Sequence, residues 1–390
     1  MFGLGRKAGA AAPVERKASA AGRVAARALP GGAGRPVAAP RDAAALVRAG
    51  FLDNPIGFRA VRLVAEAAAS VPLAVAGAEG RYALHPVLDL LARPNPAQGG
   101  AAFLEALYGQ VALTGDAFVE AAESGEGGYP GELHVLRSDR VTVVPGPDGW
   151  PAAFDYRAGG RTHRFPAGPV PAVCHVRSFH PCDDHYGLSP LRAAAAAVDV
   201  HNAATRWSKG LLDNAARPSG AIVHDGDEPL SPEAFDRLAE ELERNHQGAR
   251  NAGRPMLLDG GLDWKPMGMS PQEVEFGGVK ETAAREIATA FGVPPMLLGI
   301  PGEATYANYA EANRAFFRLT VLPLVGRATE ALAAWLGLLG GERLRIEADR
   351  DRVPALRAER DAEWARVAGA SFLSDREKRE MLGLAPEAPA

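Results

Sequence analysis

The organisation of this chain is set by two helical stretches, SPEAFDRLAEELERNH at residues 231–246 and EVEFGGVKETAAREIATAF at 273–291. In each stretch, apolar side chains recur at helical spacing. Between them lie two short strand-like runs, 255–258 and 262–265, hinged at Asp259-Gly260-Gly261. Two helices joined by a small β module predict a stalk with a tip that projects from a larger body.

A β-rich part of the body precedes the stalk. Its short apolar runs, broken by Gly and Pro, are typical of strands and fall at 117–121, 133–136, 141–144, 154–156 and 173–176. Helical patterns flank these strands at 54–71, 99–113 and 190–214. Asn54 and Ser189 each precede a proline and have the residue types of helix N-caps. This order of patterns predicts an α+β fold.

Helical patterns also dominate the chain after the stalk. A Gly/Pro-rich loop at 299–302 follows the second stalk helix, and a long helical pattern then runs over 304–339. Pro323 interrupts that pattern and should kink the helix. Ser374 and Glu377 have the spacing of a capping box. Two charged helices are therefore expected to complete the chain, at 354–370 and 374–382.

Length and composition indicate a globular protein of two or three domains. The chain has 390 residues, of which 47% are hydrophobic and 23% charged. Its two cysteines exclude a disulfide framework. The most apolar stretch, 321–339, contains Arg327 and Glu330, so no membrane span is expected.

Charge is distributed unevenly along the chain. Residues 1–50 carry nine basic and two acidic side chains, although the net charge of the whole chain is −4. The rest of the protein is therefore acidic, which does not fit a protein that holds DNA phosphates over its whole surface. Residues 1–41 are rich in Ala, Gly, Pro and Arg, and we expect them to form a disordered basic tail.

Two functional alternatives follow from the residues themselves. The basic tail could serve a nucleic-acid-binding scaffold. A metal-dependent enzyme could use the residues between positions 174 and 185, where potential ligands crowd together: Cys174, His175, His180, Cys182 and His185. This cluster lacks a second ligand pair at zinc-site spacing, and the chain contains neither a phosphate-binding loop nor a nucleophile elbow. We therefore predict no catalytic, cofactor or metal site.

Three further stretches occur in a recognisable order. They are HPVLDLLARPNP at 85–96 followed by LTGDAF at 113–118, CHVR at 174–177 leading to YGLSPL at 186–191, and IATAFGVPPMLLG at 287–299 with YANY at 306–309 and LTVLP at 319–323. Their order and spacing over 42–384 resemble the portal proteins of tailed phages, in the family typified by siphophage HK ninety-seven. Asp116 stands where that family commonly has Asn. The chain is short for the family and in this is similar to members found in gene transfer agents.

The resemblance implies a structural protein without catalysis or cofactor. Such proteins form a ring, commonly of twelve subunits, at one capsid vertex of a virion or gene transfer agent particle assembled in the bacterial cytoplasm. Double-stranded DNA enters and leaves through the channel. The implied partners are further copies of the chain, the large terminase, a head-tail adaptor and the major capsid protein, with no membrane.

The family's parts map onto the chain in order. The wing would comprise 42–230 and 304–352, the stem helices 231–247 and 273–295, the clip 248–272, the tunnel loop 296–303 and the crown 353–390. The implied clip interface consists of Met256, Leu257, Leu258 and Trp264. The implied tunnel residues are Gly299, Ile300, Pro301, Gly302 and Glu303. We expect Ile300 and Glu303 to form a collar that touches DNA sterically and repels it, so that DNA can slide.

Overall fold

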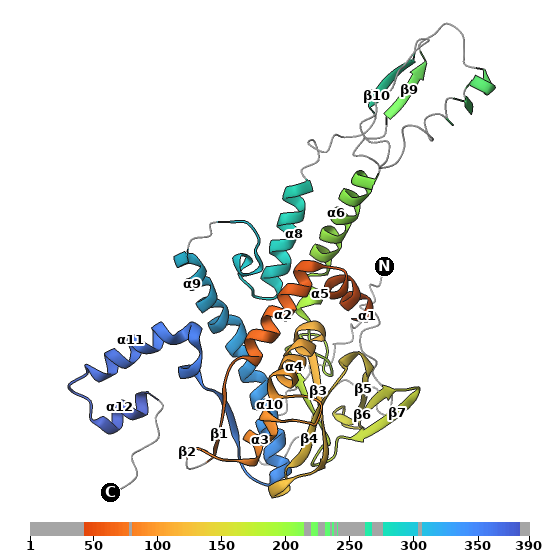
Figure 1. Ribbon diagram of the computed structural model, residues 1–390. Helices are drawn as coiled ribbons and strands as arrows, with labels where there is room; N and C mark the ends of the chain where they lie inside the picture. The colour runs from red at the N-terminus through yellow and green to blue at the C-terminus, as the bar shows by residue number, and fades with distance from the viewer. Residues whose placement is uncertain are drawn as a thin grey trace, which may run out of the picture.

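The computed structural model describes residues 43–77, 80–213, 220–224, 231–234, 236, 237, 240, 262–266, 276–302 and 306–382. Figure 1 shows a body of helices and sheets, a stalk of two helices that rises from it, and a pair of C-terminal helices set beside the body. The fold is α+β, as the order of sequence patterns predicts. The expected tail, 1–41, lies outside the described residues.

Two helices, α2 (Pro55–Ala69) and α4 (Gly100–Thr114), pack against each other in the core of the body. Both helices bury apolar residues that recur every three to four positions: Ala60, Val61, Val64 and Ala68 in α2, and Phe103, Leu107, Tyr108 and Val111 in α4. The predicted cap of α2 is confirmed, because Asn54 Oδ1 accepts hydrogen bonds from the N–H groups of Ile56 and Gly57 at 3.0 and 2.9 Å.

The β-rich segment forms two three-stranded antiparallel sheets. One has β3 (Asp116–Ser124) between β4 (Pro130–Leu136) and β8 (Val173–Arg177), and the other has β6 (Pro151–Ala158) between β5 (Val141–Pro145) and β7 (Arg161–Pro166). All five predicted strands are confirmed. β7 is missed because its polar, mostly exposed residues form no apolar run. Phe118 and Phe154 meet edge to face, with ring centroids 5.7 Å apart, and join the two sheets in one core.

A third sheet, absent from the sequence predictions, joins distant parts of the chain. β1 (Leu73–Gly77) pairs with β2 (Gly80–Arg81) and with β11 (Arg345–Ala348). Val75 and Ile346 lie opposite each other and are buried in the same core as the helices. The segments before and after the stalk are therefore one folded body.

The long helix after the stalk changes its winding near its middle. α9 (Tyr306–Phe316) leads through a π-helical turn, Phe317–Val321, into α10 (Leu322–Gly340). Pro323 has no N–H to bond the carbonyl of Leu319, so the predicted interruption takes the form of this wider turn. By length and composition alone, the helix is apolar enough to cross a membrane, but half of its apolar window is buried within the body.

Two charged helices, α11 (Arg357–Ala368) and α12 (Asp375–Met381), complete the described chain. The capping box predicted for α12 is confirmed. Ser374 Oγ accepts from the N–H of Glu377 at 3.3 Å, and Glu377 Oε2 accepts from the N–H of Ser374 at 2.8 Å. Glu359 of α11 lies within 4 Å of two arginines of the α9–α10 helix. These ion pairs are partly exposed, so each contributes at most about 1 kcal/mol.

Candidate functional site

The stalk consists of α6 (Ala195–Asp213) and α8 (Phe276–Ala290), which lie side by side (Figure 1). Both helices bury small side chains near the body, which lets them approach each other and α2 closely: Ala197, Val198 and Ala204 in α6, and Ala283, Ala284 and Ala288 in α8. The stalk therefore leaves the body as a closely packed pair.

The position of the first stalk helix differs from the sequence expectation. The helix beside α8 is α6, which belongs to the segment assigned to the wing. The assignment of 231–247 as a stem helix remains a prediction, because most of those residues lie outside the described part. At its start, Ser231 Oγ accepts from the N–H of Ala234 at 3.2 Å, as an N-cap does.

A cluster of buried polar groups, which we call the stalk joint, holds α6 to the body. Asn54 Nδ2 lies 2.9 Å from Asn202 Oδ1 and 3.2 Å from His201 Nδ1, while Asn54 Oδ1 caps α2. Asn202 Nδ2 donates to the carbonyl of Ala49 at 2.8 Å. Asn54, His201 and Asn202 are all buried. A shift of α6 against α2 would leave these groups unpaired, at about 1–3 kcal/mol for each buried group.

The stalk joint contains a histidine that is kept neutral. Burial lowers the pKa of His201, and the charge of Lys280 lowers it further. The neutral ring can accept at Nδ1, which is the atom that faces Asn54. The sequence predicts Asn54 only as a helix cap. The signal for the joint was the pair His201-Asn202 within an otherwise Ala-rich helix.

The tip of the stalk contains an antiparallel strand pair, β9 (Gly220–His224) and β10 (Leu262–Pro266). The sequence predicts a strand at 262–265 but pairs it with 255–258, which lies outside the described residues. The described partner of β10 is β9. In the chain, β9 follows α6 and β10 precedes α8.

Most of the predicted clip interface cannot be located among the described residues. Met256, Leu257 and Leu258 lie outside them. Trp264 belongs to β10, where its backbone lies opposite Ile222. Its role at an interface remains a prediction.

The loop after α8 is held tightly to its own subunit. A short 3-10 turn, Pro295–Leu298, ends at Gly299, whose φ of +74° favours glycine. Arg285 of α8 donates to the carbonyl of Pro301 and also pairs with Glu281 Oε1 at 2.7 Å. The charge of Arg285 is therefore balanced within the subunit.

One predicted tunnel residue has a different environment from the one expected. Ile300 is only 7% exposed and packs against Ala284 and Ala288 of α8, so within this subunit it lies against the stalk helix, and its place in a collar remains a prediction. The two alanines leave space that the isoleucine fills, and such burial contributes roughly 1.5–3 kcal/mol. Gly299, Pro301 and Gly302 are exposed, and Glu303 lies outside the described residues.

A second cluster, which we call the body joint, brings two of the motif stretches together. Asp116 Oδ1 lies 2.7 Å from His175 Nε2, and the Asp116 carboxylate accepts from the N–H of Gly187 at 2.9 and 3.0 Å. Asp116 is 3% exposed. Gly115 has a φ of +84°, and a Cβ there would lie 2.6 Å from the backbone of Gly187. The glycines in these stretches therefore permit close backbone approach.

Ser189 strengthens the same junction. Its Oγ accepts from the N–H of Leu191 at 3.0 Å and donates to the carbonyl of Leu113 at 2.7 Å. The predicted cap of the helix that begins at Pro190 is confirmed. This one hydroxyl both starts a helix and fixes it to the end of α4.

The arrangement of the candidate metal ligands does not favour a metal centre. Cys174 is buried in the core, and burial raises the pKa of its thiol to about 12, so the thiol stays protonated. Cys182 is exposed, and His175 is paired with Asp116. Within the part of the chain that the structure describes, no three His, Cys, Asp or Glu side chains gather in a group that could hold a metal ion.

Comparison with known proteins tests the resemblance to portal proteins. A family model described as phage portal protein matches residues 55–383. The chain belongs to the phage portal protein family. It is 37% identical over 340 residues to an uncharacterized protein of Rickettsia bellii, covering 86% of this chain and 87% of that protein. It is 28% identical over 281 residues to the probable portal protein of Streptomyces phage phiC31, covering 69% and 61%.

Solved structures agree with the family. A chain in the neck of an empty gene transfer agent particle is 62% identical, with a TM-score of 0.74 and coverage of 91% of this chain and 97% of that one. An HK97-family portal protein from Corynebacterium diphtheriae is 17% identical, with a TM-score of 0.53 and coverage of 81% and 96%, and shares the fold. The portal family is structural, so the chain is not an enzyme.

Proposed function

We propose that this portal-family chain forms a ring at one vertex of a gene transfer agent particle and that DNA enters and leaves through it. The observation that carries the proposal is its 62% identity, over 91% of the chain, to a chain of a gene transfer agent neck. A likeness of that extent supports the same place in a particle of the same kind. Another neck structure, with a chain 60% identical, was computed with C12 symmetry, which supports a ring of twelve.

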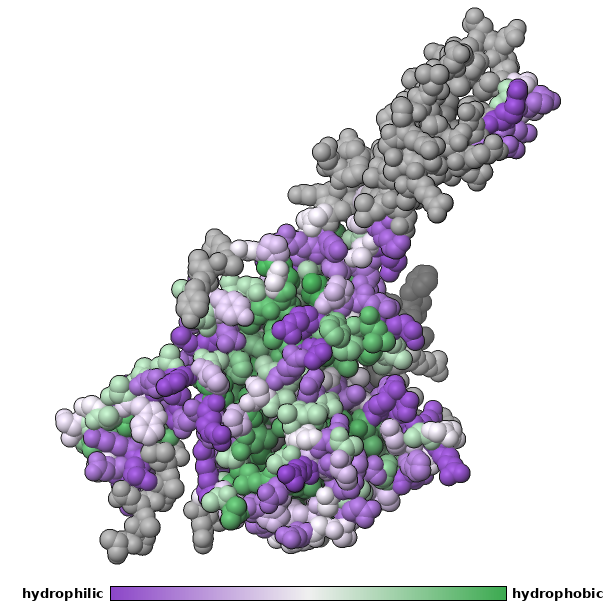
Figure 2. Space-filling view, viewed as in Figure 1, coloured by the Kyte–Doolittle hydropathy of each residue, from purple (hydrophilic) through white to green (hydrophobic). Residues whose placement is uncertain are grey.

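A ring needs two different complementary faces on each subunit. Figure 2 shows apolar side chains gathered on the body around α2. Leu52 and Phe58 are exposed there, and the ring of Phe58 lies 5.1 Å from that of Phe51. An apolar surface of this kind supports its use as one of the two subunit contacts.

The stalk supplies the parts of a conduit in this proposal. α6 and α8 act as the stem, the β9–β10 tip belongs to the clip, and the loop after α8 faces the channel. Residues 295–302 carry no charged side chain, and Arg285 is already paired. Such a loop offers no cation to hold phosphate, so DNA can pass without the salt-dependent grip that neutralised phosphates create. Glu303 adds repulsion, and Ile300 anchors the loop.

The remaining partners follow from this placement. Terminase and a head-tail adaptor would dock at the tip and the outer surface of the ring, and the major capsid protein would surround the body. The strand pair at the tip has backbone edges that neighbouring subunits can cover by strand addition. The C-terminal helices α11 and α12 would form the crown.

Removing the gene from a producing strain tests the proposal. Particles made without the chain should contain no nuclease-protected DNA, and the wild-type gene should restore it. Glu303→Lys should reduce protected DNA per particle at low salt, with relief at moderate salt, because each added cation can hold a phosphate. Glu126→Lys, an exposed change on the body, should behave as wild type. Normal DNA content without the chain would overturn the proposal.

A further inference from the structure

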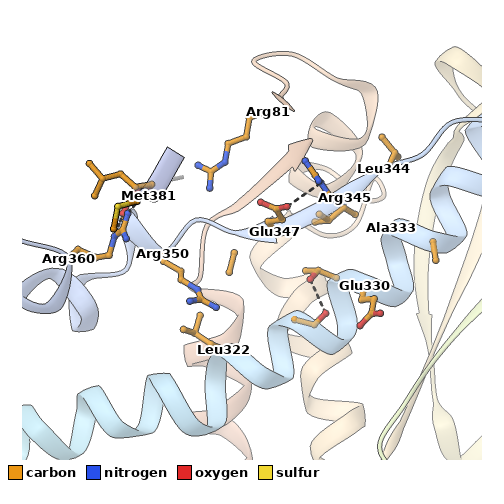
Figure 3. Close-up of a pocket in the computed structure, with 17 residues that line it drawn as sticks. Arg81, Leu322, Glu330, Ala333, Leu344, Arg345, Glu347, Arg350, Arg360 and Met381 are labelled. Atoms are coloured by element: carbon orange, nitrogen blue, oxygen red, sulfur yellow. Dashed lines mark hydrogen bonds and ion pairs between the residues drawn. The ribbon is translucent and has the colours of Figure 1, made fainter. Parts of the chain in front are cut away.

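A groove with a volume of about 710 Å³ separates the end of α12 from the helix α10 and the strand β11 of the body. In Figure 3, Met381 and Arg360 lie on one side of this space, and Glu330 and Ala333 lie on the other. The last described helix therefore stands away from the body, with an open space between them.

α12 is attached to the rest of the chain by weak contacts. None of its residues is buried, and none of the residues 369–373 that join it to α11 is buried either. Arg360 of α11 donates to the carbonyl of Leu382 at a long distance of 3.5 Å. Lys378 donates to the carbonyl of Ala368, also at 3.5 Å. A segment with so little buried surface can move at a low cost in free energy.

The two sides of the groove match each other in shape and polarity. On the α12 side, Met381 lines the groove although 54% of its surface is exposed. On the α10 side, Gly326, Thr329 and Ala333 present small side chains at helical spacing. A Cβ built on Gly326 would meet no atom within 4 Å, so this stretch of α10 has room for another side chain. A methionine adapts readily to such a surface, and burying it there removes apolar area from water.

The charges that line the groove leave one anion and one cation unpaired. Three ion pairs account for the rest: Arg81 with Asp349 at 3.6 Å, Arg345 with Glu347 at 3.4 Å, and Arg360 with Asp351. Glu330 and Arg350 also line the groove, and neither has an ionic partner among the described residues. They belong to different elements, α10 and the turn after β11, so pairing them would narrow the groove.

We propose that α12 is a lid that closes on this groove by turning about residues 369–373. In the closed state, Met381 packs against α10 at Gly326. Closure excludes water from the groove, which strengthens the attraction between Glu330 and Arg350 and draws them into an ion pair. Such a lid would operate in a single chain, whether or not the chain forms a ring.

The structure described here is the open state of the lid, and Arg360 holds it open. The Arg360 guanidinium also contacts Asp351 and Glu363, so it stays in place when the carbonyl of Leu382 leaves it. Closure therefore breaks a long hydrogen bond at the end of the helix and gains the burial of Met381. Loss and gain are of similar size, as a reversible lid requires.

Protection of a thiol in the groove tests the lid in the full-length chain. Cys182, the exposed thiol, is first replaced by Ser, and Gly326→Cys then reports on access to the groove. Ending the chain after Leu373 removes α12 and should speed modification of the new thiol about fivefold or more. Arg327→Cys is the matched control, because the Arg327 side chain lies 3.4 Å from Ser178, on another face of α10. Its rate should be the same with and without α12.

A second chain end separates the lid from the residues that follow it. Ending the chain after Leu382 keeps α12 and should leave the modification rate of Gly326→Cys unchanged. A faster rate in that chain would show that residues 383–390 cover the groove and would overturn the proposal. Equal rates with and without α12 would overturn it as well.

A disulfide between the two sides captures the closed state directly. Gly326→Cys combined with Met381→Cys should form a bond within one chain, because closure brings the two Cα atoms within the reach of a disulfide. Arg327→Cys combined with Met381→Cys is the matched control and should not form one. Peptide mapping under non-reducing conditions identifies the bond. Absence of the bond would overturn the proposal, as would a bond between two chains, which would show that a neighbour fills the groove.

Charge reversal tests the ion pair. The measured quantity is the modification rate of Gly326→Cys without α12 divided by its rate in the full chain, because this ratio cancels the direct effect of nearby charge on the thiol. Glu330→Arg should lower the ratio by up to about fivefold, as expected for one exposed ion pair. Adding Arg350→Glu should restore it. A ratio that does not recover would overturn the pairing of Glu330 with Arg350.

Discussion

The stalk joint and the body joint both bury polar groups, but they differ in how many residues make their hydrogen bonds. In the stalk joint, Asn54 both caps α2 and contacts His201 and Asn202 of α6. In the body joint, the contacts of Asp116 are supported by backbone packing at Gly115 and by the hydroxyl of Ser189. Asn54 makes most of the hydrogen bonds of the stalk joint, to which Asn202 adds one with the carbonyl of Ala49, whereas the contacts of the body joint are divided among more residues.

This difference has a structural cause. The stalk joint lies where two helices leave the body, so few neighbouring residues can replace a lost contact. The body joint lies where α4, β3 and the segment before α6 meet inside a folded core. The free energy of unfolding should therefore fall more when Asn54 is replaced in the stalk joint than when a single residue of the body joint is replaced.

The largest effect is expected from Asn54→Ala. The change removes a helix cap and leaves His201 and Asn202 with unpaired buried groups, so the free energy of unfolding should fall by about 2–4 kcal/mol. Chemical denaturation measures this loss. Asn54→Asp keeps the capping oxygen but removes the donor, so it should lose less than Asn54→Ala. Equal losses would show that the capping oxygen contributes nothing and that the whole loss comes from the contacts to α6.

A smaller loss is expected from Asp116→Ala. It removes the acceptor for Gly187 and His175, at about 1–3 kcal/mol, while the neighbouring backbone contacts remain. Asp116→Asn keeps an acceptor oxygen and should lose under about 1 kcal/mol. The same denaturation series compares the two joints directly. A loss for Asp116→Ala greater than that for Asn54→Ala would contradict the difference expected between the two joints.

The stalk joint should also make stability depend on pH. Burial and Lys280 lower the pKa of His201 in the folded chain, so the unfolded chain binds a proton more readily. The stabilisation is complete above the unfolded pKa of about 6.5 and is lost as pH falls, with a slope of at most about 1.4 kcal/mol per pH unit. His201→Gln should flatten this part of the profile. Identical slopes would show that His201 does not titrate in this way.

The smallest effect concerns the two thiols. Cys182 is exposed, whereas Cys174 is buried with a raised pKa. A thiol reagent should therefore modify one cysteine in the folded chain and both after unfolding, and Cys182→Ser should leave stability within about 0.5 kcal/mol. Rapid modification of Cys174 in the folded chain would contradict its place in the core.

Features set by neighbouring residues were predictable from the sequence. The caps at Asn54, Ser189 and Ser374 follow from residue type and spacing within one turn of helix. Strands 117–121 and 173–176 follow from apolar runs between turn residues. The family itself was recognisable because its motifs are short and keep their order.

Features that depend on contacts between residues far apart in the sequence were not predictable. The pairing of β1 with β11 and of β9 with β10 joins segments whose local patterns do not specify each other. Ile300 is a single large apolar residue in a Gly/Pro-rich loop, and only the alanine face of α8 explains why it is buried. The stalk joint was missed because its polar residues look like helix interruptions when each helix is considered alone.

The central claim is that this chain assembles as a portal ring. Electron microscopy of the purified full-length protein, with its native mass measured on the same sample, tests that claim most directly. The account predicts closed rings of uniform stoichiometry, with the stalks side by side around a central channel. A monomer or dimer with no ring at any protein concentration would contradict it.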